Sequence, residues 1–205
     1  MSSPAIRRAA PRLGIFGGTF DPVHAGHLIV TKDILERAGL DHIVFVPAAR
    51  NPLKAEGPLA SGADRAEMLR AALRGMENFS VSTADIGRPP PSYALDTVAA
   101  VRREWPTAGI SWIIGHDQLP DLHRWHRIDD LAAEVDFLVL RRPGETAELP
   151  ERPGLRLRAV DTRLIELSST EIRGRIASGK SVDFFVPSAV IEVIKKNRLY
   201  ATARF

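Results

Sequence analysis

The segment Leu13–Leu28 constrains the fold of this chain more than any other part of the sequence. It reads Leu-Gly-Ile-Phe-Gly-Gly-Thr-Phe-Asp-Pro-Val-His-Ala-Gly-His-Leu. Its first apolar residues predict a short buried strand, and the pair Gly17-Gly18 then allows a sharp turn that brings the backbone close to a ligand. A helical pattern begins near Gly26-His27. The segment therefore predicts a strand, an extended turn and a helix.

The turn between this strand and this helix is a candidate phosphate site, because the free N–H groups in the first turn of a helix attract anions. His24 and His27 stand at its mouth, where each imidazole can donate to a phosphate oxygen, and Gly26 leaves room between them. The alternative is an ordinary tight turn with surface histidines. A zinc site is disfavoured, because the histidine pair lacks a third ligand and the chain has no cysteine.

The spacing His24-x-Gly-His27 resembles the (T/H)-x-G-H motif of the nucleotidyltransferase superfamily. The longer string from Gly17 to His27 resembles that of bacterial nicotinate-nucleotide adenylyltransferases, and it directly follows the predicted strand, which is the context the motif requires. The resemblance implies a catalytic role for both histidines.

Composition predicts one domain. The chain has 205 residues, of which 44% are hydrophobic, enough to bury a substantial core. We expect a disordered tail over residues 1–11 and a nucleotidyltransferase domain over residues 12–205. The chain lacks cysteine, the apolar stretch of a secretory signal and any run long enough to span a membrane, so we expect a cytoplasmic protein without a membrane partner.

The charge of the chain argues against nucleic acid as a partner. The sequence pI is 9.6, but 28 basic residues face 25 acidic ones, which leaves a formal charge of only +3. The basic residues are scattered along the sequence. Pockets for phosphorylated small molecules fit this distribution better than a long electrostatic stripe does.

Strands and helices alternate along the rest of the chain. Further strands are expected at 43–46, 79–81, 110–114, 135–140 and around 155–159, and helices at 28–38, 63–74, 93–104, from 168 toward 178, and at 188–197. This order predicts a single doubly wound, mostly parallel α/β sheet with helices on both faces, a Rossmann-like nucleotidyltransferase fold. Ligands of such folds bind at the carboxyl ends of the strands.

Two motifs after the first βα unit suggest contacts to a mononucleotide. The long loop 47–62 carries Asn51 and Lys54, which could meet a substrate phosphate or simply be solvated; Leu53 stands where the family has a histidine. The string Pro91-Ser92-Tyr93-Ala94 resembles the family's Pro-Ser-Tyr-Thr and departs at Ala94. A backbone N–H contact at that position would survive the change.

Motifs at the ends of the later strands resemble the family as well. Gly115-His116-Asp117 follows the fourth strand, and its carboxylate could accept from ribose hydroxyls or cap a helix. Trp125 beside His126 is a candidate platform for stacking on a pyridine ring, although tryptophan is more often a core residue. Arg141 follows the fifth strand.

The string Ser168-Ser169-Thr170-Glu171-Ile172-Arg173 matches the family's Ser-Ser-Thr-x-Ile-Arg in full. Hydroxyl groups at a helix start bind phosphate or cap the helix, and Arg173 lies within one turn of them. The nearby string Gly174–Ser181 satisfies the Walker A pattern, but we reject a P-loop because Gly174 falls inside the predicted helix and Gly179 has the place of its C′ residue.

The resemblance implies transfer of AMP from ATP to nicotinate mononucleotide, with Mg²⁺ carried by ATP and no metal ligand among the protein side chains. His24, His27 and Arg173 are the candidate catalytic residues. For ATP the candidates are Gly17, Gly18, Thr19, Phe20, His24, His27, Gly115, Asp117, Arg141, Ser168, Ser169, Thr170 and Arg173. For the mononucleotide they are Gly18, Thr19, Asn51, Lys54, Ser92, Tyr93, Ala94, Trp125 and His126.

Two alternatives stay open at this point. A related enzyme could adenylylate nicotinamide mononucleotide or phosphopantetheine, and a module of a different class could bind a nucleotide or RNA without catalysis. The sequence is compatible with a homo-oligomer and does not fix the oligomeric state.

Overall fold

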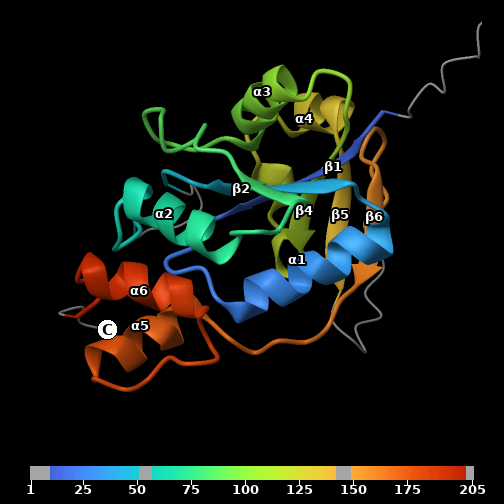
Figure 1. Cartoon of the computed structure of the whole chain (residues 1–205). Coiled ribbons are helices and arrows are strands. Elements are labelled where there is room, and N and C mark those ends of the chain that lie inside the picture. Colours follow the sequence, from blue (N-terminus) through green and yellow to red (C-terminus); the bar gives the residue numbers. More distant parts are fainter. Residues whose placement is uncertain (1–9, 51–56, 142–148, 202–205) are drawn as a thin grey trace, which may run out of the picture.

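In the computed structural model, which describes residues 10–50, 57–141 and 149–201, six strands form one sheet. Their order is β3-β2-β1-β4-β5-β6, and every neighbouring pair is parallel (Figure 1). The strands are β1 (Arg12–Gly18), β2 (His42–Pro47), β3 (Phe79–Val81), β4 (Gly109–Gly115), β5 (Asp136–Arg141) and β6 (Leu157–Asp161). The predicted doubly wound parallel sheet is confirmed.

Helices cover both faces of this sheet (Figure 1). They are α1 (Ala25–Ala38), α2 (Gly62–Ala72), α3 (Ala94–Glu104), α4 (Ile128–Glu134), α5 (Ser169–Ala177) and α6 (Ser188–Lys196). Helices α1 and α2 pack on one face, with α6 against α2, whereas α3 and α4 pack on the other. The strand order reverses between β1 and β4, the point at which doubly wound sheets leave a crevice for ligands.

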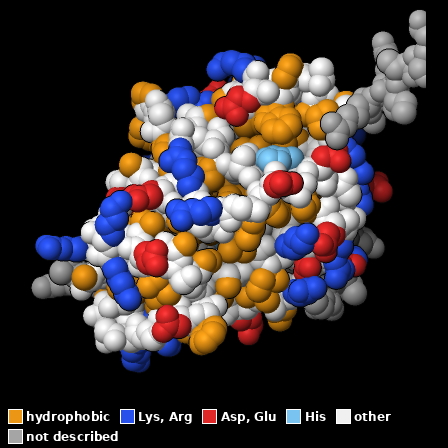
Figure 2. Space-filling model, viewed as in Figure 1, with side chains coloured by type: hydrophobic (Ala, Val, Ile, Leu, Met, Phe, Trp, Pro, Cys, Tyr) orange, Lys and Arg blue, Asp and Glu red, His pale blue; other side chains and the backbone are white. Residues whose placement is uncertain are grey.

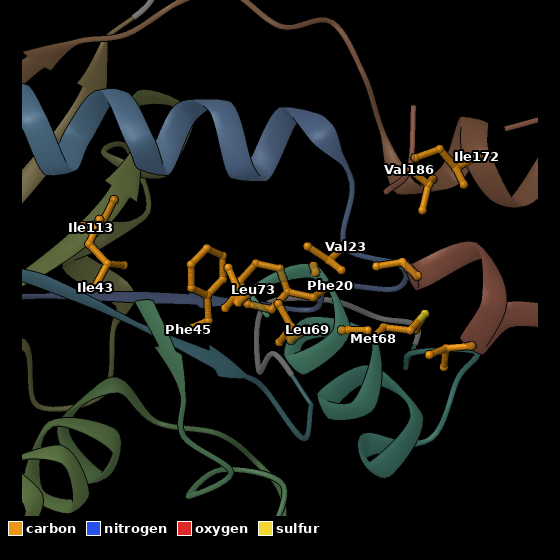
Figure 3. Packing of buried hydrophobic residues seen from close by; sticks show 14 of the residues in the cluster. Phe20, Val23, Ile43, Phe45, Met68, Leu69, Leu73, Ile113, Ile172 and Val186 are labelled. Atoms are coloured by element: carbon orange, nitrogen blue, oxygen red, sulfur yellow. The ribbon is translucent and has the colours of Figure 1, made fainter. Parts of the chain in front are cut away.

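Two apolar cores lie between the sheet and the helices, one on each face, as expected when alternate strand residues point to opposite faces. On β2, for example, Phe45 packs toward α1 and α2, whereas Val44 packs toward α3 and α4. Figure 3 shows Phe20 and Phe45 beside Leu69 of α2. Phe20 belongs to the first βα turn, so this turn is anchored in the core.

Local sequence signals set several helix ends. Gly39 follows α1 with φ 67°, and Ser61 and Ser168 accept a backbone N–H as N-caps of α2 and α5. The expected helix 63–74 in fact ends at Ala72. Helix α4 and two short 3₁₀ segments, η1 (His116–Gln118) and η2 (Leu122–Arg124), were not expected, because none is long enough to show a clear periodicity.

No helix within the described part of the chain is long and apolar enough to cross a bilayer. The expected tail lies mostly outside the described residues. The face seen in Figure 2 carries blue and red side chains side by side, without a continuous basic stripe across that face.

Candidate active site

The turn after β1 departs from ordinary backbone geometry. Phe20 has φ 50°, in the left-handed region, and its ring is buried in the core. A Cβ on Gly18 would lie 2.8 Å from that ring, so only glycine fits beside it. Gly17, Gly18 and Thr19 line the crevice beside the point where the strand order reverses.

His24 and His27 lie at the start of α1, as predicted. Their rings are stacked with centroids 3.7 Å apart, and the backbone N–H of His24 donates to His27 Nδ1 at 3.2 Å. In a neutral His27 ring the proton therefore lies on Nε2, from which it can be donated to a ligand. His24 Nδ1 is buried 3.0 Å from the position that a Cβ on Gly26 would take, which leaves Nε2 as the nitrogen available for a ligand.

Burial controls the charge of both imidazoles. It lowers the pKa of His24 to about 4, and burial together with the neighbouring His24 lowers the pKa of His27 well below its usual range. Both rings are consequently neutral at pH 7. They can act there as hydrogen-bond donors to phosphate oxygens, not as cations.

We expect stability to fall as pH is lowered from 7 to 5. In the unfolded state His24 takes up a proton near pH 6.5, and in the folded state only near pH 4. Lowering the pH through this window therefore stabilises the unfolded state relative to the folded state and reduces the free energy of unfolding. The expected loss from His24 is about 2 kcal/mol by pH 5. Urea unfolding at pH 7 and pH 5 measures it, with His24→Asn as the control. An equal pH dependence in that variant would contradict the assignment.

The motif at the start of α5 contacts the same turn from the other side. Ser169 Oγ donates to the carbonyl of Pro22 at 2.9 Å, and Arg173 Nη1 donates to the carbonyl of Asp21 at 2.8 Å. Arg173 Nη2 also donates to Thr170 Oγ1 at 3.2 Å, while Ser168 caps the helix. The two strongest motifs of the sequence thus meet, and the start of α5 lies beside the turn that leads to His24.

The predicted site residues at the ends of β4 and β5 are only partly placed as the sequence suggested. A Cβ on Gly115 would lie 2.3 Å from Asp117 Oδ1, so a larger residue at the end of β4 would have to displace the Asp117 carboxylate. The N-cap of η1 is Gly115, so the alternative role of Asp117 as an N-cap is wrong; its carboxylate is exposed. Arg141 Nε donates to Asp161 Oδ1 at 2.6 Å across β5 and β6, so its guanidinium is held by a carboxylate.

A cavity of about 370 Å³ opens beside the turn, between β1, β4 and α3. Its lining includes the mononucleotide candidates Gly18, Thr19, Ser92, Tyr93, Ala94, Trp125 and His126, together with Gly17. Asn51 and Lys54 lie outside the described residues. Most ATP candidates, including the histidine pair, do not line this cavity. Gly18 and Thr19, which belong to both predicted sets, line the cavity, whereas His24 and His27 do not.

Aromatic side chains shape one wall of the cavity. Tyr93 and His126 are stacked with ring centroids 4.1 Å apart. Trp125 meets Trp112 and Phe137 edge to face and still lines the cavity, so it has both the core role and the exposed face that stacking requires.

Sequence reasoning missed an acidic residue in this cavity. Asp85 accepts hydrogen bonds from Thr97 Oγ1 and from the Arg88 guanidinium, and burial raises its pKa. Ser92 Oγ accepts from the backbone N–H of Ala49 at 2.8 Å, which joins the loop before α3 to the segment after β2. A single aspartate without a surrounding motif gave no sequence signal for such a place.

A buried polar network behind the turn was also missed. Arg65 Nη1 donates to the carbonyls of Thr19 and Ala48, each at 2.8 Å, and Tyr200 donates to Asp21 Oδ1 at 2.8 Å. Burial and the charge of Asp21 raise the pKa of Tyr200, so its hydroxyl remains a donor. Arg65 lies within the predicted α2 and Tyr200 near the C-terminus, where neither periodicity nor a motif marks them.

Within the described residues, no group of three or more His, Cys, Asp or Glu side chains comes together in a way that could hold a metal ion. The donors around the turn are imidazole nitrogens, backbone N–H groups and a guanidinium. These groups suit phosphate oxygens better than a resident cation.

The rejected Walker A pattern is not a P-loop. Gly174 lies inside α5, and Gly179 follows its end with φ 67°. We expect Lys180→Ala to leave turnover within about threefold, because Lys180 is an exposed residue just beyond a helix end. A steady-state assay of this variant checks the expectation, and loss of ATP binding would support the Walker A interpretation instead.

The parallel sheet with its reversal between β1 and β4, and the two motifs that meet at the turn, define a nucleotidyltransferase. The family model described as Cytidylyltransferase-like matches residues 15–175. More narrowly, the chain belongs to the nicotinate-nucleotide adenylyltransferase family.

Relatives and solved structures support this assignment. A protein of Opitutus terrae named "Probable nicotinate-nucleotide adenylyltransferase" is 43% identical over 92% of this chain and 97% of its own length. One of the same name from Exiguobacterium sibiricum is 41% identical over 93% and 100%. The Plasmodium falciparum nicotinic acid mononucleotide adenylyltransferase, solved with NaAD, superposes with a TM-score of 0.71 at 16% identity, covering 94% of this chain and 98% of that one. The structural likeness shows the fold.

Proposed function

We propose that this protein transfers AMP from Mg²⁺-bound ATP to nicotinate mononucleotide, giving nicotinate adenine dinucleotide and pyrophosphate. The observation that carries the proposal is the pairing of two adjacent places at the reversal of the sheet. One is the turn with the two neutral histidines and the start of α5, and the other is the aromatic-walled cavity beside α3.

The chemistry requires no nucleophile from the protein. A phosphate oxygen of the mononucleotide attacks the α-phosphorus of ATP in line, and the bond from that phosphorus to the bridging oxygen breaks. The electron pair leaves with pyrophosphate, and a new P–O–P linkage remains in the product. The task of the protein is to hold two anions together and to stabilise the charge that develops on the leaving group.

The groups around the turn suit this task. The Nε2–H assigned to His27, and the Nε2 of His24 when it carries the proton, donate to phosphate oxygens without the repulsion that two adjacent cations would suffer. Arg173 and the first N–H groups of α5 supply positive charge on the other side of the turn. Mg²⁺ arrives with ATP as part of the substrate.

The cavity suits a nicotinate ring. Trp125 and the stacked pair Tyr93 and His126 offer aromatic surfaces for a pyridine ring. Helix α3 starts at Ala94 without a side-chain cap, so its first N–H groups are available to an anionic carboxylate. The charge of Asp85 at the cavity is offset by Arg88.

A coupled assay for pyrophosphate tests the proposal. The full chain is supplied with Mg²⁺ and ATP, and with nicotinate mononucleotide, nicotinamide mononucleotide or phosphopantetheine in turn. We expect turnover with nicotinate mononucleotide well above that with the other two acceptors. Higher turnover with another acceptor would replace the substrate but keep the reaction class. Pyrophosphate release with none of them, although ATP binds, would favour a non-catalytic nucleotide-binding module.

A further inference from the structure

The hydroxyl of Tyr200, in the turn that follows α6, reaches the nucleotide turn from the far end of the chain. It donates to Asp21 Oδ1 at 2.8 Å across a sequence separation of 179 residues. Both side chains are buried, with exposed fractions of 7% and 3%. A buried carboxylate needs hydrogen bonds to offset its lost hydration, so this contact has a defined electrostatic reason.

The Asp21 carboxylate also holds the segment before α2. Oδ2 accepts from the backbone N–H of Leu59 at 2.7 Å, and Oδ1 accepts from that of Ala60 at 3.1 Å. One carboxylate therefore joins three segments that are distant in sequence: the turn after β1, the end of the loop after β2, and the C-terminal turn.

The hydrogen bonds of the Asp21 carboxylate form one clamp on the turn, and those of the Arg65 guanidinium form a second clamp beside it. Arg65 is 1% exposed, and its Nη1 donates to Thr19, on the cavity wall, and to Ala48. Its Nε donates to the carbonyl of Ala60 at 3.3 Å, so both clamps meet at Ala60. Figure 3 shows Phe20, which lies between the clamped residues Thr19 and Asp21, packed beside α2.

We propose that Tyr200 is a positioning residue for adenylyl transfer: through the Asp21 carboxylate it fixes the turn that carries Thr19 and His24 against the segment Leu59–Ala60. This inference rests on the proposed function. Tyr200 acts from behind the turn, because its hydroxyl contacts Asp21 and it does not line the cavity.

Loss of the hydroxyl should act on rate more than on binding. In Tyr200→Phe the carboxylate keeps its two backbone donors but loses the side chain that fixes its orientation. The turn can then still bind nucleotides while holding the reacting phosphates less accurately, and reaction rates are more sensitive than affinities to such displacements. We expect kcat to fall about tenfold, with KM for ATP and for the mononucleotide within twofold of wild type.

A matched control separates this effect from loss of stability. Val193→Ala in α6 removes two buried methyl groups from the core cluster to which Tyr200 belongs, without touching the Asp21 hydrogen bonds. Both variants and the wild type are assayed as full chains, at a temperature where circular dichroism shows all of them folded. We expect the control to retain kcat within twofold. A Tyr200→Phe enzyme that also retains it would overturn the proposal.

A second variant and a second readout keep the inference testable if Tyr200→Phe folds poorly. Asp21→Asn should lower kcat as well, and adding Tyr200→Phe to it should cause little further loss; independent, multiplicative losses would overturn the proposal. Amide hydrogen exchange should be faster at Leu59 and Ala60 in Tyr200→Phe, and unchanged exchange would also overturn it. A wild type that releases no pyrophosphate would reject the proposed function instead, while the exchange comparison would still decide whether Tyr200 holds the turn.

Discussion

Replacing His27 by alanine is expected to lower kcat at least about a hundredfold. The neutral ring is assigned a proton on Nε2, and a donor placed before the developing charge of the leaving group stabilises the transition state by several kcal/mol in other enzymes. Because the contact strengthens as charge develops, kcat should fall more than KM rises. Steady-state pyrophosphate release at saturating ATP measures this, and near-wild-type turnover would remove His27 from the catalytic set.

The stability of this variant needs a separate measurement. His27 Nδ1 accepts the backbone N–H of His24, and its ring meets Phe20 with centroids 5.1 Å apart. The loss of these contacts should cost about 1 to 2 kcal/mol of folding free energy. The kinetic assays are therefore run well below the melting temperature of the variant. His123→Ala removes an exposed imidazole elsewhere and serves as the control, with turnover expected near wild type. His24→Ala should resemble His27→Ala with a smaller effect.

Local patterns were enough to predict the framework of the fold. The third strand was expected at Phe79–Val81 and lies there, and Gly39 ends α1 as predicted. These features depend on hydrophobic periodicity and on the backbone preference of glycine, both of which are visible within a few residues. The turn motif lies at the carboxyl end of β1, as the parallel fold predicts. Helix α5 reaches it through residues 162–168, which follow the edge strand β6.

The buried polar contacts could not be predicted in the same way. Arg65 and Asp85 belong to residue types that are mostly exposed. Arg65 is buried against the carbonyls of Thr19 and Ala48, and Asp85 accepts from Thr97 of α3. Helix α1 gives a smaller example: its buried face includes Asp33, whose carboxylate accepts the backbone N–H of Arg163. The sequence does not display which segments such side chains meet: Thr19 lies 46 residues from Arg65, and Arg163 lies 130 residues from Asp33.

The cavity should prefer nicotinate mononucleotide to nicotinamide mononucleotide by at least tenfold in kcat/KM, which corresponds to about 1.4 kcal/mol. The start of α3 presents N–H groups without a side-chain cap, and these favour a carboxylate. A carboxamide turned with its NH₂ toward the same donors would leave them unpaired. Asp85 opposes the substrate carboxylate, but Arg88 and Thr97 engage its oxygen, so the preference should be reduced and not reversed.

Ala94→Pro tests the source of this preference. Ala94 is the first residue of α3, where proline is well tolerated, and Tyr93 before it is already extended at φ −97° and ψ 136°. The substitution removes one N–H from the start of the helix while leaving Asp85 and Trp125 in place. We expect the fold to be retained and the ratio of the two kcat/KM values to fall several-fold toward nicotinamide mononucleotide. An unchanged ratio would mean that another part of the cavity discriminates between the two mononucleotides. His126 is then the next residue to substitute, because its stacked ring can accept a hydrogen bond as well as donate one.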